Sequence, residues 1–287
     1  MRVVVAGAAG NLGWEVTNTL LEAGHTVVAL DYNIQRLEPI RSQLAVMQQI
    51  DLRQSAGLED LLAGADVVIT TVGISRPKKL SDFHDVDYLS NLNLLQAAKK
   101  AGAGLFVYIS VAGVDTDQSV PLLKAKHDFE QALTSSGLPY LIIRPSSYFT
   151  DLWRTFMTNA QKGKITLIKT SEPYRFSPVH PKDVALFIAS HLDQKNQVYP
   201  VGGPEQFTYP EIADLCFELL GTAPKISYMS VTGFDLFLGI LKLLKPPLWS
   251  VMRFLRWAST TDLTCPAIGQ RTAREYLIEN LARETAG

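Results

Sequence analysis

Short apolar runs alternate with helical patterns through the first half of the chain. The apolar runs lie near residues 2–6, 26–31, 45–50, 66–71, 104–110 and 139–144, and the helical patterns near 11–23, 57–63, 83–102 and 122–136. Runs such as Asp66–Thr71 are almost continuously apolar, which is typical of strands that are buried on both faces of a sheet. The pattern therefore predicts an α/β fold with a doubly wound parallel sheet and helices on both faces.

The pattern loosens after Pro145. Residues 179–192 return to helical periodicity, residues 198–201 are typical of one more strand of the sheet, and the chain from Thr208 onward is mainly helical in pattern. We therefore expect a main domain over residues 1–150 with a returning segment near 177–203. A smaller, mainly helical lobe, formed by residues 151–176 and 204–287, is expected to cover the substrate.

The first predicted strand runs straight into a glycine turn with the spacing G-x-x-G-x-x-G, and the turn opens an amphipathic helix. Where glycine has no Cβ, the backbone can approach a pyrophosphate, and the start of the helix offers free N–H groups to it. The turn therefore predicts a dinucleotide site. Its predicted binding residues are Gly7, Gly10, Asn11, Leu12 and Gly13.

An acidic residue, Asp31, ends the second predicted strand. A carboxylate at this position can accept hydrogen bonds from both ribose hydroxyls and would repel a 2′-phosphate, so it favours NAD over NADP. The alternative is a solvated turn acid in front of Asn33. In that case another residue, such as Arg36, would contact the ribose.

Composition narrows the classes of partner. The 287-residue chain carries 27 basic and 28 acidic residues. With this net charge of -1, the protein as a whole does not attract the negatively charged backbone of nucleic acid. Cys216, Cys265 and the five histidines show no metal-type spacing, so we predict no metal site and a reducing compartment. The first apolar stretch is only as long as a strand, so no secretory signal is expected and the predicted location is cytoplasmic.

With these features the sequence resembles the short-chain dehydrogenase/reductase superfamily, in particular its atypical, NmrA-like branch with an NAD(P)-binding Rossmann domain. The segments that carry the resemblance further are Ile50–Leu52, Asn91–Ala98, Phe106–Ser110, Gly137–Tyr140, Ile143–Pro145, Val179–Ala185 and Gly202–Glu205. The resemblance implies that Asp51 and Leu52 lie by the adenine. It also implies that Thr71, Val72 and Gly73 line the cofactor, and that Arg144, Pro145 and Ser146 border the nicotinamide.

The chain departs from the superfamily at the Tyr-x-x-x-Lys motif, because Lys126 fits the lysine while Leu122 occupies the tyrosine position. The resemblance makes Lys126 a candidate general acid/base or ribose anchor; the alternative is a surface lysine paired with Glu130. Ser110 resembles the catalytic serine or threonine, although a serine that ends a strand can simply make a local hydrogen bond. Tyr148 could replace the missing hydroxyl, or only pack in the smaller lobe.

Two functions follow from this interpretation. The first is an NAD(P)-dependent oxidoreductase that acts on a small apolar carbonyl, quinone or alkene, and the alternative is a non-catalytic NAD(P)-binding sensor or regulator. The apolar region 231–258 is interrupted by charged residues and prolines, so we do not expect it to span a membrane. We interpret it as a lid over the substrate, with an oligomer interface and contact with a membrane surface as the alternatives.

Overall fold

The computed structural model describes residues 1–54 and 56–286. Their contacts divide the chain into two compact units, Met1–Arg144 with Val184–Tyr199, and Pro145–Asp183 with Pro200–Gly287. The glycine turn and the first five strand-to-helix alternations therefore belong to the first unit. Most of the region after Pro145 belongs to the second.

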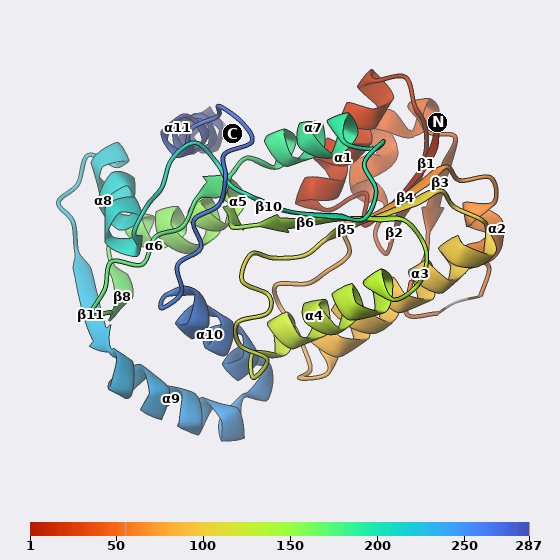
Figure 1. Cartoon of the computed structure of the whole chain (residues 1–287). Helices are drawn as coiled ribbons and strands as arrows, with labels where there is room; N and C mark the ends of the chain where they lie inside the picture. The colour runs from red at the N-terminus through yellow and green to blue at the C-terminus, as the bar shows by residue number, and fades with distance from the viewer. Residues whose placement is uncertain (55, 287) are drawn as a thin grey trace. The chain divides into compact units, whose positions relative to one another are not determined.

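A seven-stranded sheet forms the centre of the first unit, in the order β10-β6-β5-β4-β1-β2-β3 (Figure 1). Its strands are β1 (Arg2–Ala6), β2 (Thr26–Asp31), β3 (Val46–Gln49), β4 (Val67–Thr70), β5 (Leu105–Ile109), β6 (Tyr140–Pro145) and β10 (Gln197–Val201). The central strand β1 pairs in parallel on both sides, with Val3 opposite Val27 of β2 and Val67 of β4. The predicted Rossmann-type parallel sheet is confirmed, including the late strand that returns to its edge.

Helices cover both faces of this sheet, as predicted. They are α1 (Asn11–Glu22), the 3₁₀ helix η1 (Gln35–Gln43), α2 (Leu58–Leu62), the π-helix η2 (Phe83–Ser90), α3 (Asn91–Lys100), α4 (Pro121–Thr134) and α7 (Pro181–Ser190). In Figure 1, α3 and α4 run along one face of the sheet and α1 lies on the other. Leu94 of α3 and Phe129 of α4 pack with Phe106 and Tyr108 of β5 in a fully buried core. The helix predicted over residues 83–102 is present as η2 followed by α3, so its first part is π-helical.

The second unit combines helices with two small sheets. Its elements are β7 (Ser147–Tyr148), α5 (Phe149–Leu152), η3 (Trp153–Met157), α6 (Thr158–Gln161), β8 (Ile165–Lys169), β9 (Pro178–Val179), α8 (Tyr209–Leu219), β11 (Ile226–Ser230), α9 (Val231–Leu244), α10 (Pro246–Ala258) and α11 (Ala273–Ala286). The parallel pair of β8 and β11 was not predicted. Most of β11 is exposed, so it lacks the apolar run that identifies a buried strand. Within the described ranges, no helix is both long and apolar enough to cross a bilayer.

Candidate functional site

The glycine turn that follows β1 packs tightly against itself. Gly7 has a φ of 77°, a left-handed conformation that favours glycine, and its N–H donates to the carbonyl of Leu30 at 2.9 Å. A Cβ on Gly13 would lie 1.9 Å from the carbonyl oxygen of Gly7, so only glycine fits there. A Cβ on Gly10 would meet only that same oxygen, at 3.2 Å. Chain packing therefore requires glycine at position 13 but leaves space open beside Gly10.

The amino end of α1 lies at this open space. Gly10 is the N-cap residue, it gives no side-chain cap, and the first turn of the helix contains no acidic residue. The first N–H groups of a helix have no partner within the helix, and together with the helix dipole they favour a phosphate. The residues present therefore fit the pyrophosphate of a dinucleotide.

Asp31 and Arg36 carry opposite charges, and both contact the glycine turn or the start of α1. The two carboxylate oxygens of Asp31 accept the N–H groups of Ala9 at 2.9 Å and Asn33 at 3.0 Å. The exposed guanidinium of Arg36 donates to the Asn11 side chain at 3.1 Å and lies 5.2 Å from the centre of a Trp14 ring. An acid suited to a ribose and a base suited to a 2′-phosphate therefore lie at one turn.

The segment that follows β4 brings the predicted residues Thr71, Val72 and Gly73 to the same edge of the sheet. The Thr71 hydroxyl donates to the Gly7 carbonyl at 3.0 Å, which joins the ends of β4 and β1. A Cβ on Gly73 would lie 2.6 Å from Oδ1 of Asp87 and 3.4 Å from Nζ of Lys126. The backbone at Gly73 therefore passes directly over a buried pair of charges.

This pair joins Asp87 of η2 to Lys126 of α4. Their charged atoms are 3.3 Å apart, and the side chains are 0% and 12% exposed. Nζ of Lys126 also donates to the carbonyl of Ile109 at 3.2 Å, next to Ser110. The alternative of a surface lysine paired with Glu130 is therefore wrong. Glu130 is itself buried and forms a two-point ion pair with Arg144, with N–O distances of 3.0 and 2.5 Å.

The low-dielectric surroundings set the charge state of these groups. Burial raises the pKa of Asp87, and the Lys126 ammonium opposes that shift. Burial also raises the pKa of the Tyr108 hydroxyl, with further contributions from the charges of Asp87 and Glu130. The Lys126 ammonium lies 5.4 Å from the centre of the Tyr108 ring, where it adds a cation–π contact. The Lys126 ammonium therefore lies among buried acidic and aromatic side chains.

Ser110 lies at the end of β5, close to this pair. Its side chain is buried, and its Oγ has no hydrogen-bond partner among the described residues. Its backbone N–H donates to the carbonyl of Ile143 at 2.8 Å, so the strand alone already satisfies the backbone. A buried hydroxyl without a partner is rare and costs free energy, which makes Ser110 a group available to a ligand.

Asp51 and Leu52, which the resemblance places by the adenine, follow β3. Asp51 accepts hydrogen bonds from the Arg53 guanidinium, the closest at 2.5 Å. This contact lowers the pKa of the Asp51 carboxyl. Leu52 is buried in the core of the first unit, and its carbonyl accepts the Asn93 amide at 3.0 Å. Their contact with an adenine stays a prediction.

Pro145, Ser146 and Tyr148 belong to the second unit. The Ser146 hydroxyl donates to the Leu263 carbonyl at 2.6 Å and accepts the Ser177 N–H at 3.0 Å, so it already joins three segments of its own unit. The Tyr148 hydroxyl oxygen is buried and has no hydrogen-bond partner within the part of the chain that the structure describes. Burial raises the pKa of Tyr148. The contact of Pro145 and Ser146 with the nicotinamide, and the role of Tyr148 as the replacement hydroxyl, stay predictions.

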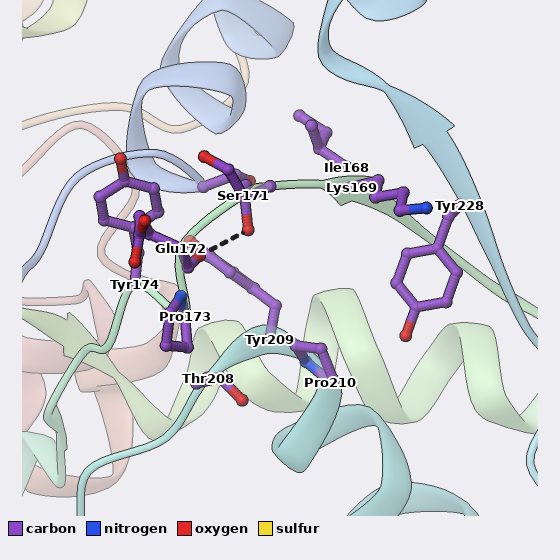
Figure 2. Close-up of a pocket in the computed structure, with 12 residues that line it drawn as sticks. Ile168, Lys169, Ser171, Glu172, Pro173, Tyr174, Thr208, Tyr209, Pro210 and Tyr228 are labelled. Carbon is purple, nitrogen blue, oxygen red and sulfur yellow. Dashed lines mark hydrogen bonds between the residues drawn. The ribbon is translucent and has the colours of Figure 1, made fainter.

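The second unit also contains an open pocket of about 300 Å³, shown in Figure 2. It lies between the end of β8, the start of α8 and β11. Three tyrosines line it, Tyr174, Tyr209 and Tyr228, together with the charged side chains Lys169 and Glu172. Its volume is at the lower limit of the range for small-molecule sites, and it opens to solvent.

Sequence reasoning missed Asp87, whereas it had named Arg36 as the alternative contact for the ribose. Asp87 and Asn91 are four residues apart in the predicted helix, and Asn91 accepts a hydrogen bond from Thr70 at 2.6 Å. Polar residues at that spacing on a buried face were the signal that could have identified the cluster. No cluster of three metal-ligating side chains occurs in residues 1–54 and 56–286.

Comparison with known proteins finds a family that matches most of the chain. A family described as NAD(P)H-binding matches residues 7–195, well over half of the chain. The photosystem II assembly factor Ycf39 of Trieres chinensis is 26% identical, over 79% of this chain and 72% of the relative. The chloroplastic divinyl chlorophyllide a 8-vinyl-reductase of Zea mays is 30% identical over 83% of this chain, and the match spans 64% of that reductase.

Solved structures share the fold at lower identity. The NADPH-dependent quinone oxidoreductase QOR2 of Escherichia coli, complexed with NADPH, superimposes with a TM-score of 0.78 at 20% identity and covers 97% of this chain and 99% of its own. The Citrobacter sp. triphenylmethane reductase complexed with NADP(H) gives a TM-score of 0.74 at 19% identity, over 98% and 99%. At these identities the likeness establishes the fold, and the site residues rest on the geometry above.

Proposed function

The chain belongs to the NAD(P)H-binding family, and from that premise we propose that it is an NAD(P)H-dependent reductase of a small apolar substrate. The bound dinucleotide would supply the hydride. Gly7, Gly10 and the amino end of α1 would hold its pyrophosphate, and Thr71 to Gly73 would line it. The candidate substrates are carbonyls, quinones and activated alkenes.

The observation that carries this proposal is the Asp87–Lys126 pair beneath Gly73. Asp87 fixes the Lys126 ammonium in a site with little solvent, where a positive charge stabilises a developing oxyanion or enolate more strongly than in water. Lys126 can also donate a proton to the reduced substrate, with the Ser110 hydroxyl beside it as a second donor. These residues would supply the acid that the missing tyrosine supplies elsewhere in the superfamily.

The names of similar proteins support a conjugated substrate. They describe reduction of a vinyl group on a chlorophyllide, of a quinone and of a triphenylmethane. The match spans only 64% of the maize reductase. We therefore treat that enzyme's substrate as one candidate among the conjugated molecules to be tested.

Cofactor choice within NAD(P) depends on Asp31 and Arg36. We propose that Asp31 disfavours a 2′-phosphate, as the strand-ending acid does in NAD-binding relatives of this fold. Arg36 offers that phosphate a partner, which would moderate the preference for NAD.

Steady-state oxidation of NADH and NADPH against quinones, aldehydes and vinyl-bearing tetrapyrroles would test the proposal. We expect turnover with at least one conjugated acceptor, and loss of that turnover in Lys126→Met. Tight cofactor binding without turnover on any acceptor would reject the reductase.

One observation favours a second function, a non-catalytic NAD(P)-binding sensor. Leu122 replaces the tyrosine, and Lys126 is already paired with Asp87 and with the carbonyl of Ile109. A similar protein is described as an assembly factor. On this alternative, cofactor binding would change the affinity for a protein partner, while no acceptor would be reduced.

A further inference from the structure

Helices α9 and α10 form a hairpin in the second unit (Figure 1). The hydroxyl of Ser230 caps α9 by accepting the N–H of Gly233 at 3.1 Å, and Pro246 and Pro247 begin α10. Arg256 of α10 donates to Asp235 of α9 at 2.9 Å, which ties the two helices together. The hairpin is therefore held together by its own contacts, and the side that faces away from the rest of the unit can be described as one surface.

That outer face is aliphatic. On α9, Leu243 is 84% exposed, Leu244 74%, Leu236 70% and Ile240 53%, whereas Leu238 and Leu241 are buried on the opposite side. Positions 236, 240, 243 and 244 lie on one side of a helix. With the partly exposed Phe237 and Leu248, these four residues form what we call the outer hairpin face. A contiguous exposed apolar surface marks an interaction site rather than an ordinary solvated surface.

Basic side chains lie beside this face, although Arg256 is already paired with Asp235. Residues 231–258 contain four basic residues, Lys242, Lys245, Arg253 and Arg256, against the single acid Asp235, although the whole chain carries a net charge of -1. Lys242 and Lys245 are exposed at the tip, and the Lys242 ammonium lies 5.2 Å from the centre of the Trp249 ring. Leucines, basic side chains and a tryptophan at one tip form the pattern of a helix that lies in a membrane interface.

We propose that the outer hairpin face docks the protein onto an anionic lipid bilayer. Leu243 and Leu244 would enter the boundary between head groups and acyl chains, and Lys242 and Lys245 would contact lipid phosphates. The 14 residues of α9 extend roughly 21 Å, too short to cross a hydrocarbon core of about 30 Å, so the helix lies along the surface.

A second copy of the chain fits the outer hairpin face less well than an anionic bilayer does. A two-fold contact through this face would offer Lys242 and Lys245 no free acidic partner within residues 231–258, because Asp235 already pairs with Arg256. Anionic lipid instead offers acyl chains to the leucines and negative charge to the lysines. This proposal does not depend on whether the protein is a reductase.

Flotation of the full chain with vesicles would test it. We expect binding to vesicles of phosphatidylcholine mixed with phosphatidylglycerol, weaker binding to phosphatidylcholine alone, and a decline as salt is raised. The double variant Leu243→Glu/Leu244→Glu should lose binding by roughly 10-fold or more, since it puts two charges into the apolar boundary. Lys242→Gln/Lys245→Gln should weaken binding to the anionic vesicles only.

A matched control is Ile278→Glu, because Ile278 is an aliphatic residue of α11 that is 48% exposed. This variant should bind vesicles like the wild type, and unchanged circular dichroism would show that all variants fold. Equal binding by the wild type and the Leu243→Glu/Leu244→Glu variant would overturn the proposal. The proposal would also be overturned if the wild type did not bind anionic vesicles but formed a dimer that the same double variant dissociates. That result would assign the face to a protein contact.

Discussion

The ammonium of Lys126 lies 3.3 Å from the carboxylate of Asp87, a residue with no exposed surface. A charge pair in such a place is stable only while both partners are present, because removing one leaves the other buried and unpaired. The same pair lies beneath Gly73, one of the residues predicted to line the cofactor. Its substitution should therefore change both the chemistry and the stability of the protein.

We expect Lys126→Met to lower turnover roughly 10²-fold while most of the cofactor affinity remains, because the stem is kept and the charge and donors are lost. Stability should fall with a specific pH dependence. Without the ammonium, the pKa of Asp87 rises further, so above the ordinary carboxyl pKa of about 4 the folded state holds a proton that the unfolded state releases. The loss in melting temperature should then be small at acid pH and grow as the pH rises.

Two controls separate these effects. Lys124→Met removes an exposed lysine of the same helix, which pairs with Asp128, and should leave both turnover and stability close to wild type. Lys126→Met/Asp87→Asn should remove the pH-dependent loss of stability without restoring turnover. In Asp87→Asn alone, a shifted pH profile of kcat would identify Asp87 as a positioning residue. Full turnover in Lys126→Met would exclude the lysine as the proton donor.

Gly10 and Gly13 should respond differently to substitution. Gly13→Ala forces a Cβ against the backbone of Gly7 and should cost about 1–3 kcal/mol of stability, or more. Gly10→Val meets only one carbonyl within the chain, so it should melt near the wild-type temperature and still lose cofactor affinity, because the side chain fills the space left for a pyrophosphate. Calorimetric titration with NADH and NADPH, beside thermal melts, would check both. Undiminished cofactor affinity in Gly10→Val would mean that the turn is structural.

The same glycines show how far sequence reasoning reached. The strand, turn and helix around Gly7 to Gly13 were predictable because local sterics and hydrophobic periodicity determine them. The Asp87–Lys126 pair was not, because it joins residues 39 positions apart, and only the packing of η2 on α4 brings them together. The strand β11 was missed because most of it is exposed and it leaves little apolar signal. Buried strands and tight turns are thus readable from sequence, whereas long-range polar partners are not.

Asp31 and Arg36 should shift cofactor preference in opposite directions. Asp31→Ser removes a negative charge beside the expected position of the 2′-phosphate and should improve NADPH affinity relative to NADH. Arg36→Ala should weaken NADPH by roughly 10-fold, the scale of one charge-assisted contact, and change NADH little. Dissociation constants for both cofactors would be measured by fluorescence titration. Should both variants retain the wild-type ratio, neither residue contacts the ribose.

Ser110 and Tyr148 offer the two alternative hydroxyls, and each can be removed at little cost to the fold. Both oxygens are buried without a hydrogen-bond partner among the described residues, so Ser110→Ala and Tyr148→Phe should leave the melting temperature near wild type or raise it slightly. We expect Ser110→Ala to reduce turnover, because Ser110 directly follows Ile109, whose carbonyl accepts a hydrogen bond from Lys126. Tyr148→Phe should leave turnover unchanged, since burial raises the pKa of Tyr148 and makes its hydroxyl a poor acid at neutral pH. Single-turnover rates for both variants would decide, and the reverse order of effects would make Tyr148 the replacement for the missing tyrosine.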